Sequence, residues 1–237
     1  MTQKFSPLTA DQIEAIQQID TPTIANVLEP LNIRPWNEGF MKPEIRCMFP
    51  EFGTRVGYAV TVTMTAAEPG EGIPRDRYWE SILNMPAPRI VVIQDNDYPD
   101  SVGSFWGEVQ ANICLGLDCV GAVTNGGVRD LPVVRELGFQ FHAKDVLVSH
   151  AYVRVESLDI PVSVGGLEIR PGDLLATDVH GVIQIPHEIA PRLPELAAEA
   201  ARAEAVMIEA ARSKNVTVET LKDAAVRMQQ IRKGDIH

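Results

Sequence analysis

Apolar positions along the chain fall into short runs of strand length that alternate with stretches of helical spacing. The expected strands are residues 57–65, 89–95 and 119–124, and the expected helices after each of them are residues 75–84, 107–118 and 131–137. A strand followed by a helix and then by another strand is typical of parallel βαβ units. The pattern therefore predicts an α/β fold built around a parallel sheet.

Helical patterns also occupy both ends of the chain. Thr9 and Gln12 have the spacing of a capping box, and Pro22 marks the first position of a second helix. After the first 186 residues the composition shifts to Ala and Glu at helical spacing. We therefore expect one α/β domain over residues 1–186, N-terminal helices included, and a C-terminal helical extension over residues 187–237. The extension is expected to pack on the same domain or on a neighbouring subunit.

Composition narrows the class of protein. The chain has 237 residues, of which 45% are hydrophobic and 22% are charged, values that are ordinary for a soluble globular protein. Its net charge of −11 argues against nucleic acid and anionic membranes as bulk partners. Three cysteines without CxxC spacing, the lack of an apolar leader and the lack of a long apolar run predict a cytoplasmic protein that does not enter a membrane.

One pair of opposite charges suggests a functional site. Arg129 and Asp130 follow the expected strand 119–124 across a glycine turn, in TNGGVRDLP, and Glu108 lies at the start of the helix after strand 89–95. The carboxyl ends of neighbouring parallel strands meet at one edge of a sheet, where ligands bind. We therefore expect these three side chains to lie close together.

The residue types suit a divalent cation and an acidic substrate. Asp130 is a suitable ligand for Mg²⁺ or Mn²⁺, Arg129 can grip a carboxylate with two N–H groups, and Glu108 can orient or deprotonate water. The free backbone N–H groups of Val109 and Gln110 at the helix start suit an anion. A simpler interpretation makes Asp130 the cap of the following helix and Glu108 a first-turn acid that complements the helix dipole.

The spacing of these residues resembles a family motif. Glu108, twenty intervening residues and then Arg129-Asp130 are similar to the D/E-x20-R-D motif of the class II pyruvate aldolases in the 4-hydroxy-4-methyl-2-oxoglutarate (HMG/CHA) aldolase family. This RraA-like family also contains the RraA-type regulators of ribonuclease E. Three blocks within residues 20–186 fall in family order: GTRVGYAVTVT, WGEVQANICLGLDCVGAVTNGGVRD and GLEIRPGDLLATDVHGVIQIP.

The resemblance implies a swivelling β/β/α domain of the RraA-like type, homotrimeric or homohexameric rings, and sites near subunit interfaces. It also implies a lyase that cleaves a small 2-oxo acid to pyruvate by retro-aldol chemistry with Mg²⁺ or Mn²⁺. By this resemblance Asp130 would bind the metal, Glu108 would reach it through a water molecule, and Arg129 would hold the pyruvyl unit. Arg129 and Glu108 would be the catalytic residues. The substrate carboxylate would also meet residues at the helix start, namely Gly107, Val109 and Gln110.

Other functions are left open by the same residues. Decarboxylation of oxaloacetate passes through the same pyruvate enolate. A protein-binding regulator without chemistry is the alternative from another class; such family members tend to lack the acid at the position of Glu108, which this chain keeps. Asn125 stands where the family commonly has an acid, and Gln110 stands where it has an apolar residue. These two changes leave a different reaction at the same metal site as a third hypothesis.

Overall fold

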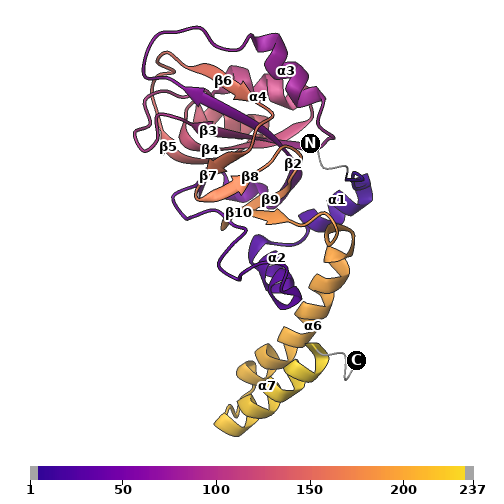
Figure 1. The fold of residues 1–237 in the computed structure, drawn as a ribbon. Coiled ribbons are helices and arrows are strands. Elements are labelled where there is room, and N and C mark those ends of the chain that lie inside the picture. The colour runs from indigo at the N-terminus through magenta and orange to yellow at the C-terminus, as the bar shows by residue number, and fades with distance from the viewer. Residues whose placement is uncertain (1–4, 233–237) are drawn as a thin grey trace.

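The structure, a computed structural model, describes residues 5–232, and Figure 1 shows their arrangement. Residues 1–4 of the expected α/β domain and residues 233–237 of the expected C-terminal extension lie outside the described residues. The strands are β1 (Arg46–Cys47), β2 (Arg55–Thr65), β3 (Arg89–Asp95), β4 (Cys119–Val128), β5 (Gln140–Val146), β6 (Arg154–Leu158), β7 (Val162–Val164), β8 (Leu167–Ile169), β9 (Leu174–Asp178) and β10 (Gly181–Ile185). The α-helices are α1 (Ala10–Gln17), α2 (Thr21–Leu28), α3 (Arg75–Leu83), α4 (Glu108–Gly116), α5 (Leu131–Leu137), α6 (Leu193–Arg212) and α7 (Val218–Arg232).

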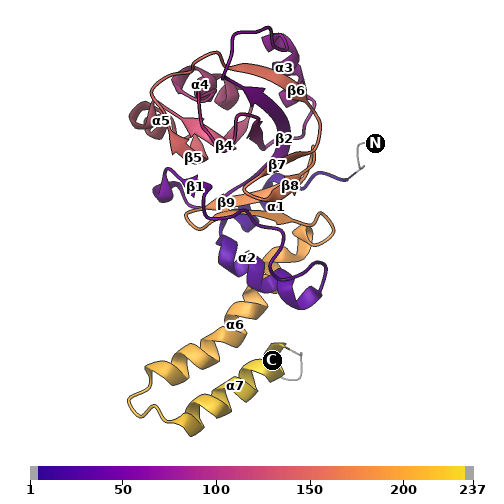
Figure 2. The ribbon, with the colours of Figure 1, turned by 60° about the vertical axis from the view of Figure 1, so that its left-hand side comes forward.

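The main sheet has the strand order β1-β5-β4-β3-β2-β9-β10, and β6 pairs with the carboxyl end of β2. Strands β2 to β5 are parallel neighbours, so their carboxyl ends lie at the same edge. The sheet curls until β5 approaches the end of β9, where Nε2 of His142 lies 2.8 Å from the carbonyl O of Asp178. The result is a nearly closed barrel, which Figure 2 shows from a second side.

Both faces of the central strands are buried, which explains their continuous apolar sequences. On β3, Val91 and Ile93 pack with helices α3, α4 and α5, whereas Ile90 and Val92 pack on the opposite face with the β7–β8 hairpin. A third apolar cluster joins α1, α2 and the start of α6 to strands β2, β9 and β10. The parallel strands are therefore held rigidly, and their carboxyl ends form a fixed edge for the loops that follow.

The α/β fold that the pattern predicts is confirmed, in several places to the residue. The strand 89–95 and the helix 131–137 have the predicted bounds. The capping box at Thr9 is present. Pro22 is the second rather than the first residue of its helix, because the carboxylate of Asp20 takes the cap position and accepts from the first turn.

The predicted glycine turn in TNGGVRDLP is wrong. Strand β4 continues through this stretch to Val128, with a shift of register on the way. A Cβ on Gly126 would collide with Oδ2 of Asp95, and a Cβ on Gly127 would collide with the side chain of Leu147. The two glycines therefore make room for neighbouring side chains and do not reverse the chain.

The last two helices form an antiparallel hairpin that extends away from the barrel (Figures 1 and 2). Leu193 at the start of α6 is buried in the cluster with α1 and α2. Farther along, Ala203 of α6 and Ala224 of α7 are buried, and Arg232 lies 3.3 Å from Glu204 across the hairpin. Across the described part of the chain, no helix joins the length and the apolarity needed to span a bilayer.

Candidate active site

The two segments that carry the expected site residues run side by side. Trp106, just before α4, forms a bridge with Val128 of β4, and the N–H of Arg129 donates to the carbonyl O of Trp106 over 3.1 Å. Oγ of Ser104 lies 2.7 Å from the same carbonyl O and 2.8 Å from the carbonyl O of Gly127. Because these contacts are to backbone atoms, they fix the start of α4 beside the connection between β4 and α5.

Asp130 contacts the start of α4 directly. The N–H of Glu108 donates to Oδ2 of Asp130 over 3.0 Å. A Cβ on Gly107 would lie 2.5 Å from the same oxygen, so glycine is required there for the carboxylate to fit. Asp130 has a left-handed backbone, with φ 59° and ψ 31°, a conformation that is uncommon outside glycine and that clusters at functional sites. The structure thus brings the predicted carboxylate to the predicted helix start.

Arg129 and Asp130 do not form a close pair with each other. Nε of Arg129 lies 3.8 Å from Oδ2 of Asp130, beyond hydrogen-bonding distance, and the two side chains are 35% and 38% exposed. The simpler interpretation of Asp130 as a side-chain cap is wrong. It occupies the N-cap position of α5, but its carboxylate makes no capping bond to the described first turn of that helix and bonds to Glu108 instead.

The first turn of α4 offers open donors beside these charges. Its N-cap residue is Gly107, which has no side chain to cap the helix. Within the described chain, the backbone N–H groups of Val109 and Gln110 have no hydrogen-bond acceptor. Free N–H groups and the positive end of the helix dipole together favour a bound anion. The helix start therefore has open donors, and its anion-binding role stays a prediction.

A cavity of about 660 Å³ opens beside this helix start. Of the residues expected to bind substrate, Arg129, Val109 and Gln110 line it. Gly107 and the contact between Glu108 and Asp130 adjoin these lining residues directly. The predicted site residues are therefore gathered at one place: three of them line the cavity, and Gly107, Glu108 and Asp130 adjoin these three without being among the described lining residues.

Sequence reasoning missed much of the cavity wall. Tyr78 of α3 and Phe105 form an edge-to-face pair, with ring centroids 5.4 Å apart and an angle of 87° between the planes. Arg75 of α3 and Arg154 at the start of β6 add two guanidinium groups to that of Arg129 in the wall. No local pattern marks Arg154, because it bonds to the carbonyl O of Glu68, which lies 86 positions away in the sequence.

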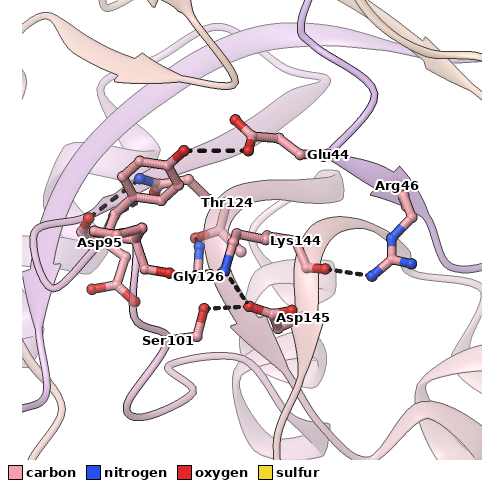
Figure 3. Close-up of polar contacts among 11 residues, drawn as sticks. Glu44, Arg46, Asp95, Ser101, Thr124, Gly126, Lys144 and Asp145 are labelled. Carbon is pink, nitrogen blue, oxygen red and sulfur yellow. Dashed lines mark hydrogen bonds and ion pairs between the residues drawn. The ribbon is translucent and has the colours of Figure 1, made fainter.

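Polar side chains hold the loop between β3 and α4 against β5 (Figure 3). Oγ of Ser101 donates to Oδ2 of Asp145 over 2.7 Å, and Nζ of Lys144 donates to the same oxygen over 2.7 Å. Nζ of Lys144 also lies 2.8 Å from the carbonyl O of Pro99. The Lys144 ammonium lowers the pKa of Asp145, so the two side chains interact as opposite charges. Their contacts with Ser101 and Pro99 position the segment that leads into the start of α4.

Asn125, the residue that replaces an acid in the family motif, is buried in β4 and does not line the described cavity. Its Oδ1 accepts from the N–H of Asp95 over 2.7 Å, and its Nδ2 donates to the carbonyl O of Asp95 over 3.3 Å. Asn125 therefore continues the pairing of β3 with β4 where the regular ladder shifts. Its role is structural, so this replacement does not alter the cavity wall.

Asp95 is a buried carboxyl at the end of β3, beside Gly126 (Figure 3). It is 1% exposed, and its Oδ2 has no hydrogen-bond partner in the described chain. Burial raises the pKa of Asp95 to about 6, the N–H of Asp97 opposes this rise, and the charge of Asp97 adds to it. Asp95 therefore gains its proton at a higher pH than an ordinary aspartate does.

The carboxylates beside the cavity wall are of the kind that a hard divalent cation binds. Within residues 5–232, no three His, Cys, Asp or Glu side chains come together as a metal site. The available donors are the carboxylates of Asp130, which is 38% exposed, and of Glu108, which is exposed. Mg²⁺ is commonly held by one or two carboxylates, with water and substrate filling its other positions, whereas structural Zn²⁺ takes closed sets of His and Cys. The residues present therefore fit Mg²⁺ or Mn²⁺.

Comparison with known sequences identifies a family. The sequence model of the RraA-like family (Aldolase/RraA) matches residues 21–184. The chain is 28% identical over 109 residues to Protein DlpA of Legionella pneumophila (strain Philadelphia 1). It is also 28% identical over 88 residues to a protein of Halalkalibacterium halodurans provisionally named 4-hydroxy-4-methyl-2-oxoglutarate aldolase. These matches cover 45% and 37% of this chain, and they span only 17% and 42% of the two relatives.

Two solved structures share the fold. An uncharacterized protein from Pseudomonas syringae pv. tomato str. DC3000 has a TM-score of 0.71 at 20% identity, with 99% of this chain and 98% of that chain covered. RraAS2 from Streptomyces coelicolor, described as an unusual member of the RNase ES inhibitor RraA protein family, has a TM-score of 0.68 at 20% identity, with 84% and 97% covered. The expected RraA-like α/β fold with C-terminal helices is therefore confirmed.

Proposed function

Because the chain belongs to the RraA-like family (Aldolase/RraA), we propose that it is a lyase that cleaves a 4-hydroxy-2-oxo acid to pyruvate by metal-dependent retro-aldol chemistry. The observation that carries this proposal is the contact between the N–H of Glu108 and Oδ2 of Asp130, beside Arg129 and the cavity. It joins a carboxylate, a guanidinium and a helix start at a point that a small acid can reach. The relative named as an aldolase supports the same reaction class.

Asp130 is the proposed metal ligand, and Glu108 is proposed to reach the ion through water. When bound, Mg²⁺ or Mn²⁺ supplies Lewis-acid stabilisation for the negative charge that cleavage leaves on the pyruvate unit. The bond from the N–H of Glu108 to Oδ2 orients the carboxylate of Asp130, so its other oxygen has a defined direction for a ligand.

Arg129 is proposed to bind the substrate carboxylate, with the N–H groups of Val109 and Gln110 as further donors. As the bond between C3 and C4 breaks, the 4-hydroxyl must lose its proton and C4 becomes a carbonyl carbon. The carboxylate of Glu108, acting through water, accepts that proton and then returns it to C3 of the enolate, which gives pyruvate. Arg129 stabilises the charge that grows during cleavage, and its geometry is already set before the reaction.

Oxaloacetate decarboxylation is a related activity of the same proposed site. Loss of carbon dioxide from oxaloacetate leaves the same pyruvate enolate as retro-aldol cleavage. The roles of Arg129 and of the α4 N–H groups are then unchanged. No hydroxyl proton is removed, because carbon dioxide leaves from a carboxylate that carries no proton, and the proton that reaches C3 of the enolate then comes from water.

A protein-binding regulator without chemistry is the second candidate. The observation that favours it is the fold shared with RraAS2, which is described as a member of the RNase ES inhibitor RraA protein family. The presence of Glu108 and an open cavity beside Arg129 favours the lyase. The two candidates differ in one measurable property, because a regulator releases no pyruvate from any substrate.

We also propose that the protein is a cytoplasmic homo-oligomer, a trimer or a hexamer, with its sites near subunit interfaces. Family membership and the hairpin that extends from the barrel support assembly. Light scattering coupled to size-exclusion chromatography measures the mass in solution. A purely monomeric mass at micromolar concentration contradicts the oligomer.

The experiment that tests the function is an assay of pyruvate release from 4-hydroxy-4-methyl-2-oxoglutarate and from oxaloacetate. It is run with Mg²⁺ or Mn²⁺ and with EDTA, for the wild type and for Asp130→Ala. Release that requires the metal and is lost in the variant is the expected result. Asp118→Ala is the matched control, because Asp118 is also a left-handed aspartate near an arginine, at the other end of β4. The lyase is rejected if folded, metal-binding wild type releases no pyruvate from either substrate.

A further inference from the structure

The cavity beside α4 continues past Arg129 along a second polar segment, residues 150–154. His150, Tyr152 and Arg154 of this segment line it, and no aspartate or glutamate is among its described lining residues. The cavity of about 660 Å³ is also larger than a three-carbon acid requires. A substrate bound at Arg129 therefore has room for a tail that meets the segment 150–154.

The segment 150–154 is anchored to the loop that leads into α4. The N–H of Ser104 donates to the carbonyl O of Ser149 over 3.0 Å, and Oγ of Ser104 lies 2.8 Å from the carbonyl O of Gly127. Ser104 thus joins the start of this segment to the connection that carries Arg129. Ala151 has a left-handed backbone, with φ 47°, a strained conformation for a residue with a side chain and one that clusters at functional sites.

The imidazole of His150 adds an acceptor to the cavity wall. Its Nδ1 lies 2.7 Å from the carbonyl O of Ala151. A carbonyl oxygen only accepts, so Nδ1 carries the hydrogen, and in the neutral imidazole Nε2 keeps the lone pair. The His150 side chain is exposed and lines the cavity, so a ligand can reach it. A hydroxyl group donates a hydrogen bond to such a nitrogen, whereas a carboxylate oxygen is repelled by its lone pair.

Two neighbours on the same segment complete a set of donors and acceptors. Tyr152 is 57% exposed, and its phenol can both donate and accept a hydrogen bond. Arg154 only donates; its side chain is 21% exposed and is held in place by a bond to the carbonyl O of Glu68. Every hydroxyl group of a ligand also donates and accepts, so a hydroxylated chain can use all three side chains. An anionic group can use only the donors.

We propose that the substrate is a 4-hydroxy-2-oxo acid whose tail carries further hydroxyl groups and no second anionic group, an acid of the sugar-acid class. This inference rests on the proposed function and deepens it by naming the substrate class. Arg129 receives the 2-oxo acid end, and His150, Tyr152 and Arg154 receive the hydroxyl groups of the tail. Cleavage between C3 and C4 gives pyruvate and a hydroxyaldehyde. The 4-hydroxyl proton passes to Glu108 through water and then to C3, so no further reactant is required.

The test compares two ligands that differ only in the tail, N-propyloxamate and N-(2,3-dihydroxypropyl)oxamate. Each has the shape of a 2-oxo acid with nitrogen in place of C3, and neither has a hydroxyl at the position of C4, so neither is cleaved. Their affinities for the full chain are measured by calorimetry with Mg²⁺ at pH 8, which is above the ordinary pKa of histidine. The dihydroxy ligand is expected to bind about tenfold more tightly to the wild type, the usual effect of one or two hydrogen bonds.

His150→Asn is expected to lose most of this advantage and to keep the affinity for N-propyloxamate. The shorter amide can still donate to the carbonyl O of Ala151, so the turn is retained, but it does not reach the position of Nε2. Tyr152→Phe removes only a hydroxyl from an exposed residue and is expected to reduce the advantage as well. His180→Asn is the matched control, because Nδ1 of His180 lies 3.2 Å from Oδ1 of Asp178 and His180 lines a different cavity beside α2. The control is expected to show the full advantage.

Equal affinity of the two ligands for the wild type overturns the proposal, and so does an advantage that survives in both His150→Asn and Tyr152→Phe. Tighter binding of N-(2-carboxyethyl)oxamate than of the dihydroxy ligand also overturns it. The pyruvate assay separates these results from a failure of the proposed function. Metal-dependent pyruvate release without a preference for the dihydroxy ligand leaves the lyase standing and rejects the hydroxylated tail. A preference that depends on His150, without pyruvate release, supports the site for a hydroxylated tail and rejects the lyase.

Discussion

The backbone N–H of Glu108 donates to Oδ2 of Asp130 over 3.0 Å, across 22 positions of the sequence. This bond joins the first residue of α4 to the residue just before α5. It exists because β3 and β4 are parallel neighbours, so the segments that follow them meet at one edge of the sheet. It also leaves the Glu108 side chain free for another role.

Asp130→Asn is expected to lower kcat/KM for pyruvate release by about 10²–10³. The amide keeps the shape of the side chain, and asparagine tolerates the left-handed backbone, so the variant removes little besides the charge. Steady-state kinetics measures the change in kcat/KM, and thermal unfolding measures any change in stability. The unfolding temperature is expected to stay close to that of the wild type. A variant as active as the wild type contradicts Asp130 as the metal ligand, and Asp118→Asn is the matched control.

Gly107→Ala is expected to lower kcat by about 10², because a small displacement of a catalytic group has a cost of that size. The added Cβ would lie 2.5 Å from Oδ2 of Asp130 and would push the carboxylate away from the N–H of Glu108. The control is Gly116→Ala in the same helix, where a Cβ meets nothing within 4 Å. The control is expected to keep full activity and to be slightly more stable, by about 0.5–1 kcal/mol. Equal activity of the two variants contradicts the steric argument.

Glu108→Gln tests the role of the Glu108 carboxylate separately from the role of the Glu108 backbone N–H. The N–H bond to Asp130 survives the substitution, so the affinity for oxalate, an analogue of the pyruvate enolate, is expected to be unchanged in the presence of Mg²⁺. The value of kcat is expected to fall by about 10²–10⁴, the usual contribution of a general base. Calorimetry and steady-state kinetics measure the two quantities. Loss of oxalate affinity equal to the loss of kcat shows instead that the side chain serves binding.

Asp95 is expected to make the protein less stable as the pH rises from about 4 to 6. In this window the folded state holds the proton on Asp95, with its pKa of about 6, whereas the unfolded chain has released it at the ordinary value of 3.8. The free energy of unfolding therefore falls through the window, by at most about 3 kcal/mol, and the contribution is constant above it.

Asp95→Asn is uncharged at every pH and tests this contribution of Asp95. Denaturant unfolding from pH 4 to pH 8 measures the free energy of unfolding of the wild type and the variant. As the pH rises, the free energy of unfolding of the variant is expected to increase relative to that of the wild type. The variant is expected to be the more stable protein at pH 8. Parallel profiles for the two proteins would mean that Asp95 does not titrate in the window.

The parallel core and the meeting of the site residues follow from patterns that are local in the sequence. The apolar run 89–95 has to be a buried strand, and Gly138 ends the helix 131–137 with a left-handed residue. Once two such βαβ units are recognised, Glu108 and Asp130 are expected to lie close together, because the carboxyl ends of neighbouring parallel strands meet at one edge of the sheet. This part of the site was therefore predictable.

The features that the sequence did not predict depend on contacts from distant parts of the chain. Gly126 resembles a turn residue by its type, but its role is to make room for Asp95 of the neighbouring strand. The Arg154 side chain is held in the cavity wall by the loop after β2. It donates to the carbonyl O of Glu68 and packs against Gly72. Neither partner can be inferred from spacing, because no periodic pattern connects these positions.

The hairpin of α6 and α7 has a further consequence for how the protein loses its structure. Beyond the start of α6, its buried side chains in the described chain are the small residues Ala203 and Ala224, whereas β3 and β4 are buried on both faces. Two helices with so little buried surface open without disturbing the barrel. The amide protons of α7 are therefore expected to exchange with solvent through local opening, and those of β3 and β4 only when the whole domain unfolds.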